Sequence, residues 1–365
     1  MSGWSGWSGW SGWSGWSGWS GWNGPGSPDG QGSNRMLSMG INNVRQRLVK
    51  EPNSDNHYSP KYPKKINNPA DIKNSEKLHR LQTCWGELQS QIQFECDDQN
   101  TASIKHIELD FQKGKFASFD IAKITRPKAN DFFVKQLELV KLQAVKGKRD
   151  DRMDEILTEL IPALPYFAAL TGMQPNKHRW TLELLELLMA FSETSCMRFK
   201  EAFQCPRPVE YSPDVMPIIS TPEHCTLPSG HSTEAFTIAC TLRHLFNAAD
   251  VKNSAIHSHM IDLAQTVAQN RTVAGLHFPV DSAVGCALGT SMAEYFVQRC
   301  TGKHGWNSRS FECDKFVDGK GPRDFSADEV LFTTQPYLQA AQVGKDLPGG
   351  YLMPQMWAWA VAEWA

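Results

Sequence analysis

Three short segments that combine cationic side chains with histidine constrain this chain more than any other feature. They span Lys200–Pro208, Pro228–His231 and Arg271–Asp281, and together they supply three fixed cations, two histidines and one carboxylate. Arginine offers a planar fork of donors and lysine a compact point charge, so the set can neutralise a multiply charged, phosphate-like group. We therefore expect a fold that gathers the three segments around a tetrahedral oxyanion.

The second segment places Ser229 and Gly230 directly before an apolar stretch that is typical of a helix. The first N–H groups of a helix have no partner inside it and can bind an anion, and a glycine lets the backbone approach closely. His231 lies at the same helix start, where it could act as a general acid or base near neutral pH.

In the third segment, Pro279 is expected at the first helical position, which places Asp281 in the first turn of that helix. A carboxylate there could hold one imidazole N–H of His277. The other ring nitrogen would then be free as a nucleophile or as a metal ligand.

Taken in order, the motifs are Lys-x6-Arg-Pro, Pro-Ser-Gly-His and Arg-x5-His-x3-Asp. This pattern resembles the signature shared by type 2 phosphatidic acid phosphatases, bacterial class A acid phosphatases and vanadium-dependent haloperoxidases. The one departure is Asn270, where the phosphatases commonly have Ser before the Arg. The resemblance implies an enzyme with the mainly α, helical-bundle fold of this group.

The resemblance implies roles for the motif residues under two chemistries. In a phosphatase, His277 would attack phosphorus to form a phosphohistidine, and His231 would protonate the leaving alcohol. The phosphate oxygens would be bound by Lys200, Arg207, Ser229, Gly230 and Arg271. In a haloperoxidase the same residues would hold vanadate as cofactor, with His277 as the axial vanadium ligand, and bound hydrogen peroxide would oxidise halide.

Of these two, the sequence favours the vanadium-dependent haloperoxidase, with bromide as the halide. His224 lies five residues before Ser229, and the algal bromoperoxidases similarly carry a His at that place. A second imidazole there could tune the protonation of vanadate-bound peroxide, so His224 joins the expected catalytic residues. Met197 argues against this choice, since it stands where chloroperoxidases carry a Trp. The alternative is a soluble phosphatase that hydrolyses phosphate monoesters without a cofactor, in which His224 would only cap a loop.

Apolar residues at a period of 3.6 predict a helical domain. The expected helices cover 132–142, 153–164, 180–203, 232–247, 254–270, 279–300 and 323–344. The helix over 180–203 should place Lys200 in its last turn and should end before Pro206. Upstream, alternating apolar residues over 104–121 predict a small β-hairpin turned at Gly114, which we expect to be a minor edge element.

The first 80 residues differ in composition from the rest and are expected to form a tail and linker. Residues 2–22 are seven copies of Ser-Gly-Trp, a low-complexity pattern that predicts disorder. The catalytic domain is then expected over 81–365, with its motif core over 200–281. A hypothesis of a different class is an interaction protein, in which the tail binds a partner and the Trp-rich end Met356–Ala365 docks in a homo-oligomer.

Composition and charge limit the class of protein and the partners that this chain can be expected to have. The net charge of -2 gives no indication of nucleic-acid binding. No apolar stretch reaches the ~18–20 residues that cross a bilayer, and the N-terminus lacks the pattern of a signal peptide. The nine cysteines contain no CxxC pair and are typical of reduced thiols. We therefore expect a soluble, cytoplasmic protein whose partners are hydrogen peroxide and halide, or a phosphate ester.

Overall fold

The computed structural model describes residues 77–98, 100–110, 115–145, 148–160, 163–303, 305–319, 321–344, 347 and 350–365. All of them belong to one compact unit. The Ser-Gly-Trp repeat, most of the predicted linker and the turn predicted at Gly114 lie outside the described residues. The first described helix begins at Lys77, inside the segment that the sequence assigned to the tail.

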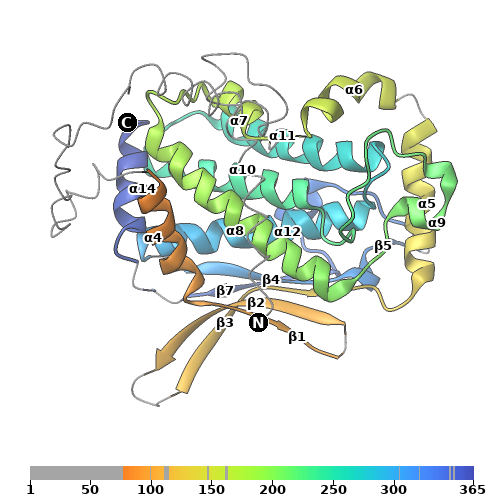
Figure 1. Ribbon diagram of the computed structural model, residues 1–365, viewed down its shortest axis with the longest axis horizontal. Helices are drawn as coiled ribbons and strands as arrows, with labels where there is room; N and C mark the ends of the chain where they lie inside the picture. Colours follow the sequence, from red (N-terminus) through yellow and green to blue (C-terminus); the bar gives the residue numbers. More distant parts are fainter. Residues whose placement is uncertain are drawn as a thin grey trace, which may run out of the picture. The chain divides into compact units, whose positions relative to one another are not determined.

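Helices make up most of the described chain (Figure 1). They are α4 (Lys77–Gln89), α5 (Asn130–Val145), α6 (Lys148–Thr158), α7 (Leu164–Thr171), α8 (Arg179–Phe203), α9 (Pro208–Tyr211), α10 (Gly230–Ala248), α11 (Ser254–Val273), α12 (Pro279–Thr301), α13 (Ala327–Phe332) and α14 (Met353–Ala362), with single 3-10 turns at Pro213–Val215 and Cys313–Lys315. The helices α8, α10, α11 and α12 closely follow their predicted bounds. Within the described ranges, no helix is both long enough and apolar enough to cross a membrane.

A mixed sheet is the part of the fold that the helical-bundle expectation did not include. Its order is β1 (Ile92–Cys96), β2 (Thr101–Asp110), β3 (Lys115–Thr125), β4 (Trp306–Glu312) and β7 (Leu338–Val343). The β3–β4 pair is parallel and the other pairs are antiparallel. A separate short pair joins β5 (Val317–Asp318) to β6 (Gly321–Pro322).

Three expectations about these elements were wrong in detail. The predicted hairpin exists as β2 and β3, but β3 is the central strand of the sheet and not a minor edge element. The helix predicted over 323–344 is replaced by the short α13 and by β7, because pairing with β4 along its whole length decides the conformation of this segment. The helix predicted over 153–164 ends as α6 at Thr158, because Pro162 has no N–H to donate to the carbonyl oxygen four residues earlier, that of Thr158.

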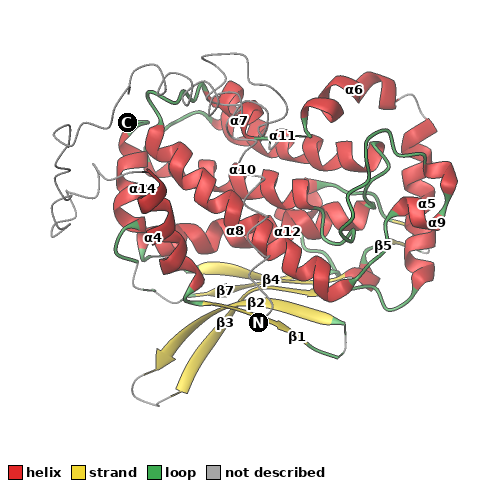
Figure 2. Ribbon diagram, in the orientation of Figure 1, coloured by secondary structure: helices red, strands yellow, loops and turns green. Residues whose placement is uncertain are grey.

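The helix α12 lies between the sheet and the other helices. It packs against β3 and β4 on one side and against α10 on the other, and Figure 2 shows the helices gathered on one side of the sheet. The residues of α12 are almost all buried, Asp281 and Arg299 among them.

Two glycines allow α10 and α12 to approach each other closely. A Cβ atom on Gly285 would lie 2.7 Å from Ser232 Cβ, and one on Gly289 would overlap the Thr233 carbonyl oxygen. The same approach lets the Ser229 N–H donate to the Asp281 carbonyl oxygen at 3.0 Å. The beginnings of the two helices, which carry motif residues, are thereby held side by side.

The C-terminal segment packs on its own chain. The Glu363 carboxylate accepts the N–H groups of Trp180 and Thr181 at 2.7 and 2.9 Å, so it caps the start of α8. The Trp364 ring stacks on His178 with centroids 4.1 Å apart. The aromatic end that the sequence suggested as an oligomer contact is therefore largely engaged within the described unit.

Gly289→Ala should lower the free energy of unfolding by about 1–3 kcal/mol, because the added methyl group meets backbone that cannot move aside easily. The matched control is Gly86→Ala in α4, where a Cβ would meet nothing within 4 Å and the better helix former should raise stability by about 0.5–1 kcal/mol. Urea unfolding measures both. A Gly289→Ala protein as stable as the parent would contradict the close crossing of α10 and α12.

Candidate active site

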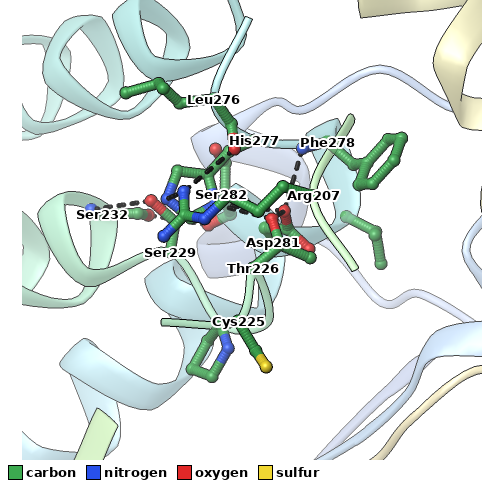
Figure 3. A network of polar contacts seen from close by, with 12 residues as sticks. Arg207, Cys225, Thr226, Ser229, Ser232, Leu276, His277, Phe278, Asp281 and Ser282 are labelled. Atoms are coloured by element: carbon green, nitrogen blue, oxygen red, sulfur yellow. Dashed lines mark hydrogen bonds and ion pairs between the residues drawn. The ribbon is translucent and has the colours of Figure 1, made fainter. Parts of the chain in front are cut away.

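The three motif segments meet where α10 and α12 begin (Figure 3). Each functional side chain is placed by the end of a helix or by the loop next to it, and most of them are fully buried. The buried ones are Lys200, Arg207, Ser229, Arg271, His277 and Asp281. Gly230 and His231 form the partly exposed first turn of α10, and His224 lies exposed in the preceding loop.

The imidazole of His277 is held in one orientation by two neighbours. Its Nδ1 lies 3.1 Å from Asp281 Oδ2 and 3.1 Å from Thr226 Oγ1. The Thr226 hydroxyl donates its own proton to Asp281 at 2.5 Å, so it can only accept at Nδ1, and Nδ1 must carry the hydrogen. The lone pair of His277 is therefore at Nε2.

His277 Nε2 faces the cations of the site. It lies 3.3 Å from Arg207 Nη1, and Figure 3 shows the two side chains next to each other. Burial, and then the charges of Arg207 and Lys200, hold the pKa of His277 well below its usual value. The ring is thus neutral, as a nucleophile or ligand must be.

The Asp281 carboxyl group is itself perturbed. Burial raises its pKa to about 6, although hydrogen bonds from Thr226 and from the Phe278 N–H oppose the shift. Its Oδ1 is buried and has no hydrogen-bond partner among the described residues. The hydrogen bond that fixes the His277 tautomer therefore depends on pH near 6.

Backbone carbonyl oxygens hold two of the three cations. Lys200 Nζ donates to the carbonyls of Cys225 and Thr226 at 2.7 and 2.9 Å, and Arg207 donates to those of His224 and Leu276 at 2.9 and 3.1 Å. Burial, reinforced by the charge of Arg207, lowers the pKa of Lys200 to about 8. At neutral pH Lys200 remains mostly protonated, with one of its three donors free of these carbonyls.

The third cation, Arg271, has a carboxylate partner that no motif indicated. Its Nη2 forms a buried ion pair with Glu159, which follows the end of α6. Asn270 donates to the other oxygen of the same carboxylate at 2.8 Å, so the residue that departs from the phosphatase pattern helps to orient Glu159. The Nε and Nη1 atoms of Arg271 are buried without a hydrogen-bond partner in the described part of the chain.

Glu159 also contacts the second histidine through its backbone. His231 Nε2 lies 2.8 Å from the Glu159 carbonyl oxygen, so Nε2 carries the hydrogen. Burial and the charge of Arg271 lower the pKa of His231 to about 3. Sequence reasoning missed both Glu159 and Thr226, since neither carries a motif and only tertiary packing brings them to the site.

His224 reaches the site from the exposed loop. Its Nδ1 lies 2.9 Å from Arg207 Nη2. Desolvation and the charges of Lys200 and Arg207 lower its pKa to about 4. Every residue that the sequence assigned to the site therefore lies within one connected region, and none is left far from it.

Among the described residues, no three His, Cys, Asp or Glu side chains gather as a set that could hold a metal cation. What the site offers is positive charge and N–H donors. It is suited to an oxyanion, whether phosphate or vanadate, because both are anionic and tetrahedral.

Residues 182–304 match the sequence model of the PAP2 superfamily, and all three motifs lie inside this range. This part of the chain is similar to the PAP2 superfamily. The match confirms the superfamily that the motifs indicated.

Other comparisons add little. A search of curated proteins finds no match. One similar solved structure is that of the first transmembrane PAP2 type phosphatidylglycerolphosphate phosphatase from Bacillus subtilis, with 17% identity, 46% of this chain and 84% of that chain covered, and a TM-score of 0.38. At that TM-score the likeness carries no argument about this protein.

Glu159→Gln should destabilise the protein by about 3 kcal/mol or more, because it leaves the buried Arg271 without a countercharge. Inorganic phosphate should then raise the melting temperature of the variant more than that of the parent, since the anion supplies the missing charge. The control Glu155→Gln removes an exposed carboxylate that contacts Asn270, and it should change stability by less than about 0.5 kcal/mol. Equal phosphate-induced shifts in the parent and in Glu159→Gln would show that the anion does not reach Arg271.

Proposed function

We propose that this protein hydrolyses phosphate esters, with the phosphoryl group bound among Lys200, Arg207 and Arg271. The observation that carries the proposal is the pair of buried, unpartnered donors on Arg271. An unsatisfied buried donor costs about 1–3 kcal/mol, and a phosphate oxygen can accept a charge-assisted hydrogen bond from such a donor. The superfamily match supports this phosphatase alternative better than the haloperoxidase that the sequence favoured.

In the proposed reaction, His277 Nε2 attacks phosphorus. The N–P bond forms as the P–O bond to the alcohol breaks, and His231 gives its proton to the leaving oxygen. His231 then takes a proton from a water molecule that attacks phosphorus, and cleavage of the N–P bond releases phosphate and restores His277. The cations and the free N–H groups at the start of α10 would stabilise the charge on the phosphoryl oxygens.

The low pKa of His231 in the free protein is compatible with this role. Burial and Arg271 disfavour the imidazolium, but a bound phosphate dianion adds negative charge next to both residues. Negative charge favours the protonated form, so the pKa of His231 should rise when substrate binds. The proton for the leaving group would then be taken up together with the substrate.

The value of kcat/KM for ester hydrolysis should fall as the pH drops through about 6. Asp281 is ionised above its raised pKa of about 6 and can then accept the His277 Nδ1–H, whereas the protonated carboxyl cannot. Asp281→Asn should remove this acidic limb and lower kcat by roughly 100-fold. The exposed carboxylate Asp214 supplies the control Asp214→Asn, which should leave the dependence of kcat/KM on pH unchanged. If kcat/KM of Asp281→Asn still falls below about pH 6, a group other than Asp281 causes the fall.

A second candidate is vanadate-dependent oxidation of bromide, supported by the contact between His224 Nδ1 and Arg207 Nη2. The open donors of Arg271 fit vanadate as well as phosphate, and His277 Nε2 would bind the vanadium. Vanadate would activate hydrogen peroxide for halide oxidation. The residues of the chain would bind the oxyanion, orient it, and exchange protons through His224 and His231.

A paired assay on one preparation separates the two candidates. We expect hydrolysis of a chromogenic phosphate ester that orthovanadate inhibits, and only trace bromination of a phenolic dye with peroxide, bromide and orthovanadate. His277→Ala should abolish hydrolysis and Lys200→Ala should weaken oxyanion binding, while His257→Ala, outside the site, should do neither. Vanadate-dependent bromination that falls in His224→Ala, with little hydrolysis, would instead establish the haloperoxidase.

A further inference from the structure

A second cavity lies away from the motif residues, between the C-terminal halves of α10 and α12 and the strand β4. It consists of two adjoining pockets, a smaller part of about 210 Å³ and a larger part of about 650 Å³, which have His244, Asn247 and Glu294 in common in their linings. At a rise of about 1.5 Å per residue, its nearest residue on α10, Cys240, lies about 15 Å along the helix from Gly230. The cavity is therefore separate from the candidate active site.

The smaller part carries more positive than negative charge. Arg243 and Arg309 both line it, and Glu294 is the one carboxylate among the described residues that line it. Glu294 is already engaged: one oxygen pairs with Arg309 at 2.8 Å, and the other accepts the backbone N–H of Asn307 at 2.7 Å. Burial lowers the pKa of His244, so this imidazole is neutral at neutral pH and does not add to the charge.

Arg243 is the residue of this group that has a buried hydrogen-bond donor without an acceptor. Its Nε is buried and has no hydrogen-bond partner among the described residues, and its guanidinium lies 5.9 Å from the centroid of the Phe332 ring. A cation–π contact with an exposed ring contributes only about 0.5–1 kcal/mol and satisfies no N–H donor. An anion in the smaller part would supply the missing acceptor and countercharge.

The larger part is more apolar and could hold an organic body. Val297, Trp306 and Trp357 line it, together with the exposed Lys303. Its volume falls in the range of about 300–1,000 Å³ that is usual for small-molecule sites. Because the two parts share lining residues, one ligand could occupy both.

We propose that this cavity binds an organic anion with an apolar body, its anionic group against Arg243 and Arg309 and its apolar body against Val297 and Trp357. The site is independent of the proposed phosphatase chemistry. The proposal stands whether the motif site hydrolyses phosphate esters or oxidises halide.

The test is a calorimetric titration of the full chain with sodium octanoate, which carries a carboxylate and an apolar body. We expect saturable binding, at least about tenfold weaker in Arg243→Gln, since a charge-assisted hydrogen bond is lost. The exposed Lys252 supplies a control with the same change in charge, and Lys252→Gln should bind like the parent. Absence of octanoate binding, or equal binding by Arg243→Gln, would overturn the proposal.

Two further titrations locate the ligand. Val297→Trp, which fills the apolar part, should weaken octanoate binding, and octyltrimethylammonium, of opposite charge, should bind far less than octanoate does. Saturating orthovanadate, which targets the motif site, should leave the octanoate affinity unchanged. Competition between orthovanadate and octanoate would place the anion at the motif site and overturn the proposal, whatever the outcome of the hydrolysis assay.

Discussion

The burial of three cations in one small region is the constraint on which the rest of this structure depends. Lys200, Arg207 and Arg271 are each almost fully removed from solvent, and a buried charge is costly unless it is paired and hydrogen-bonded. Among the described residues, only Arg271 of these three has a direct carboxylate partner. The other two are stabilised by backbone carbonyl oxygens, so the loops that supply these carbonyls must be held in fixed positions.

The crossing of α10 and α12 supplies that rigidity. Gly285 and Gly289 let the two helices touch through their backbones, which fixes the start of α10 against Asp281. The sheet on the far side of α12 keeps this helix in place, since β3 and β4 both pack against it. The sheet therefore supports the site although it contributes no motif residue.

Glu159 connects a different part of the chain to the same region. Its carboxylate balances Arg271 and its carbonyl orients His231, so one residue after α6 controls both a cation and a histidine of the site. An incoming oxyanion would share Arg271 with this carboxylate through one of the donors that remain open. At the other end of the α10–α12 pair, Arg243 lines a cavity and also has a buried donor, its Nε, without a hydrogen-bond partner among the described residues.

The sequence by itself indicated the similarity to the superfamily, the four long helices that carry the candidate site, and the cations and histidines that gather there. These features are local: motif spacing, a 3.6-residue apolar period and a proline at the start of α12 specify them without reference to distant residues. The structure alone decided that β4 and β7 join the predicted hairpin in one sheet, and that Thr226 and Glu159 complete the site. Strand pairing and the choice of a carboxylate partner depend on segments far apart in the chain, so no local pattern near residue 159 or residues 338–343 could indicate them.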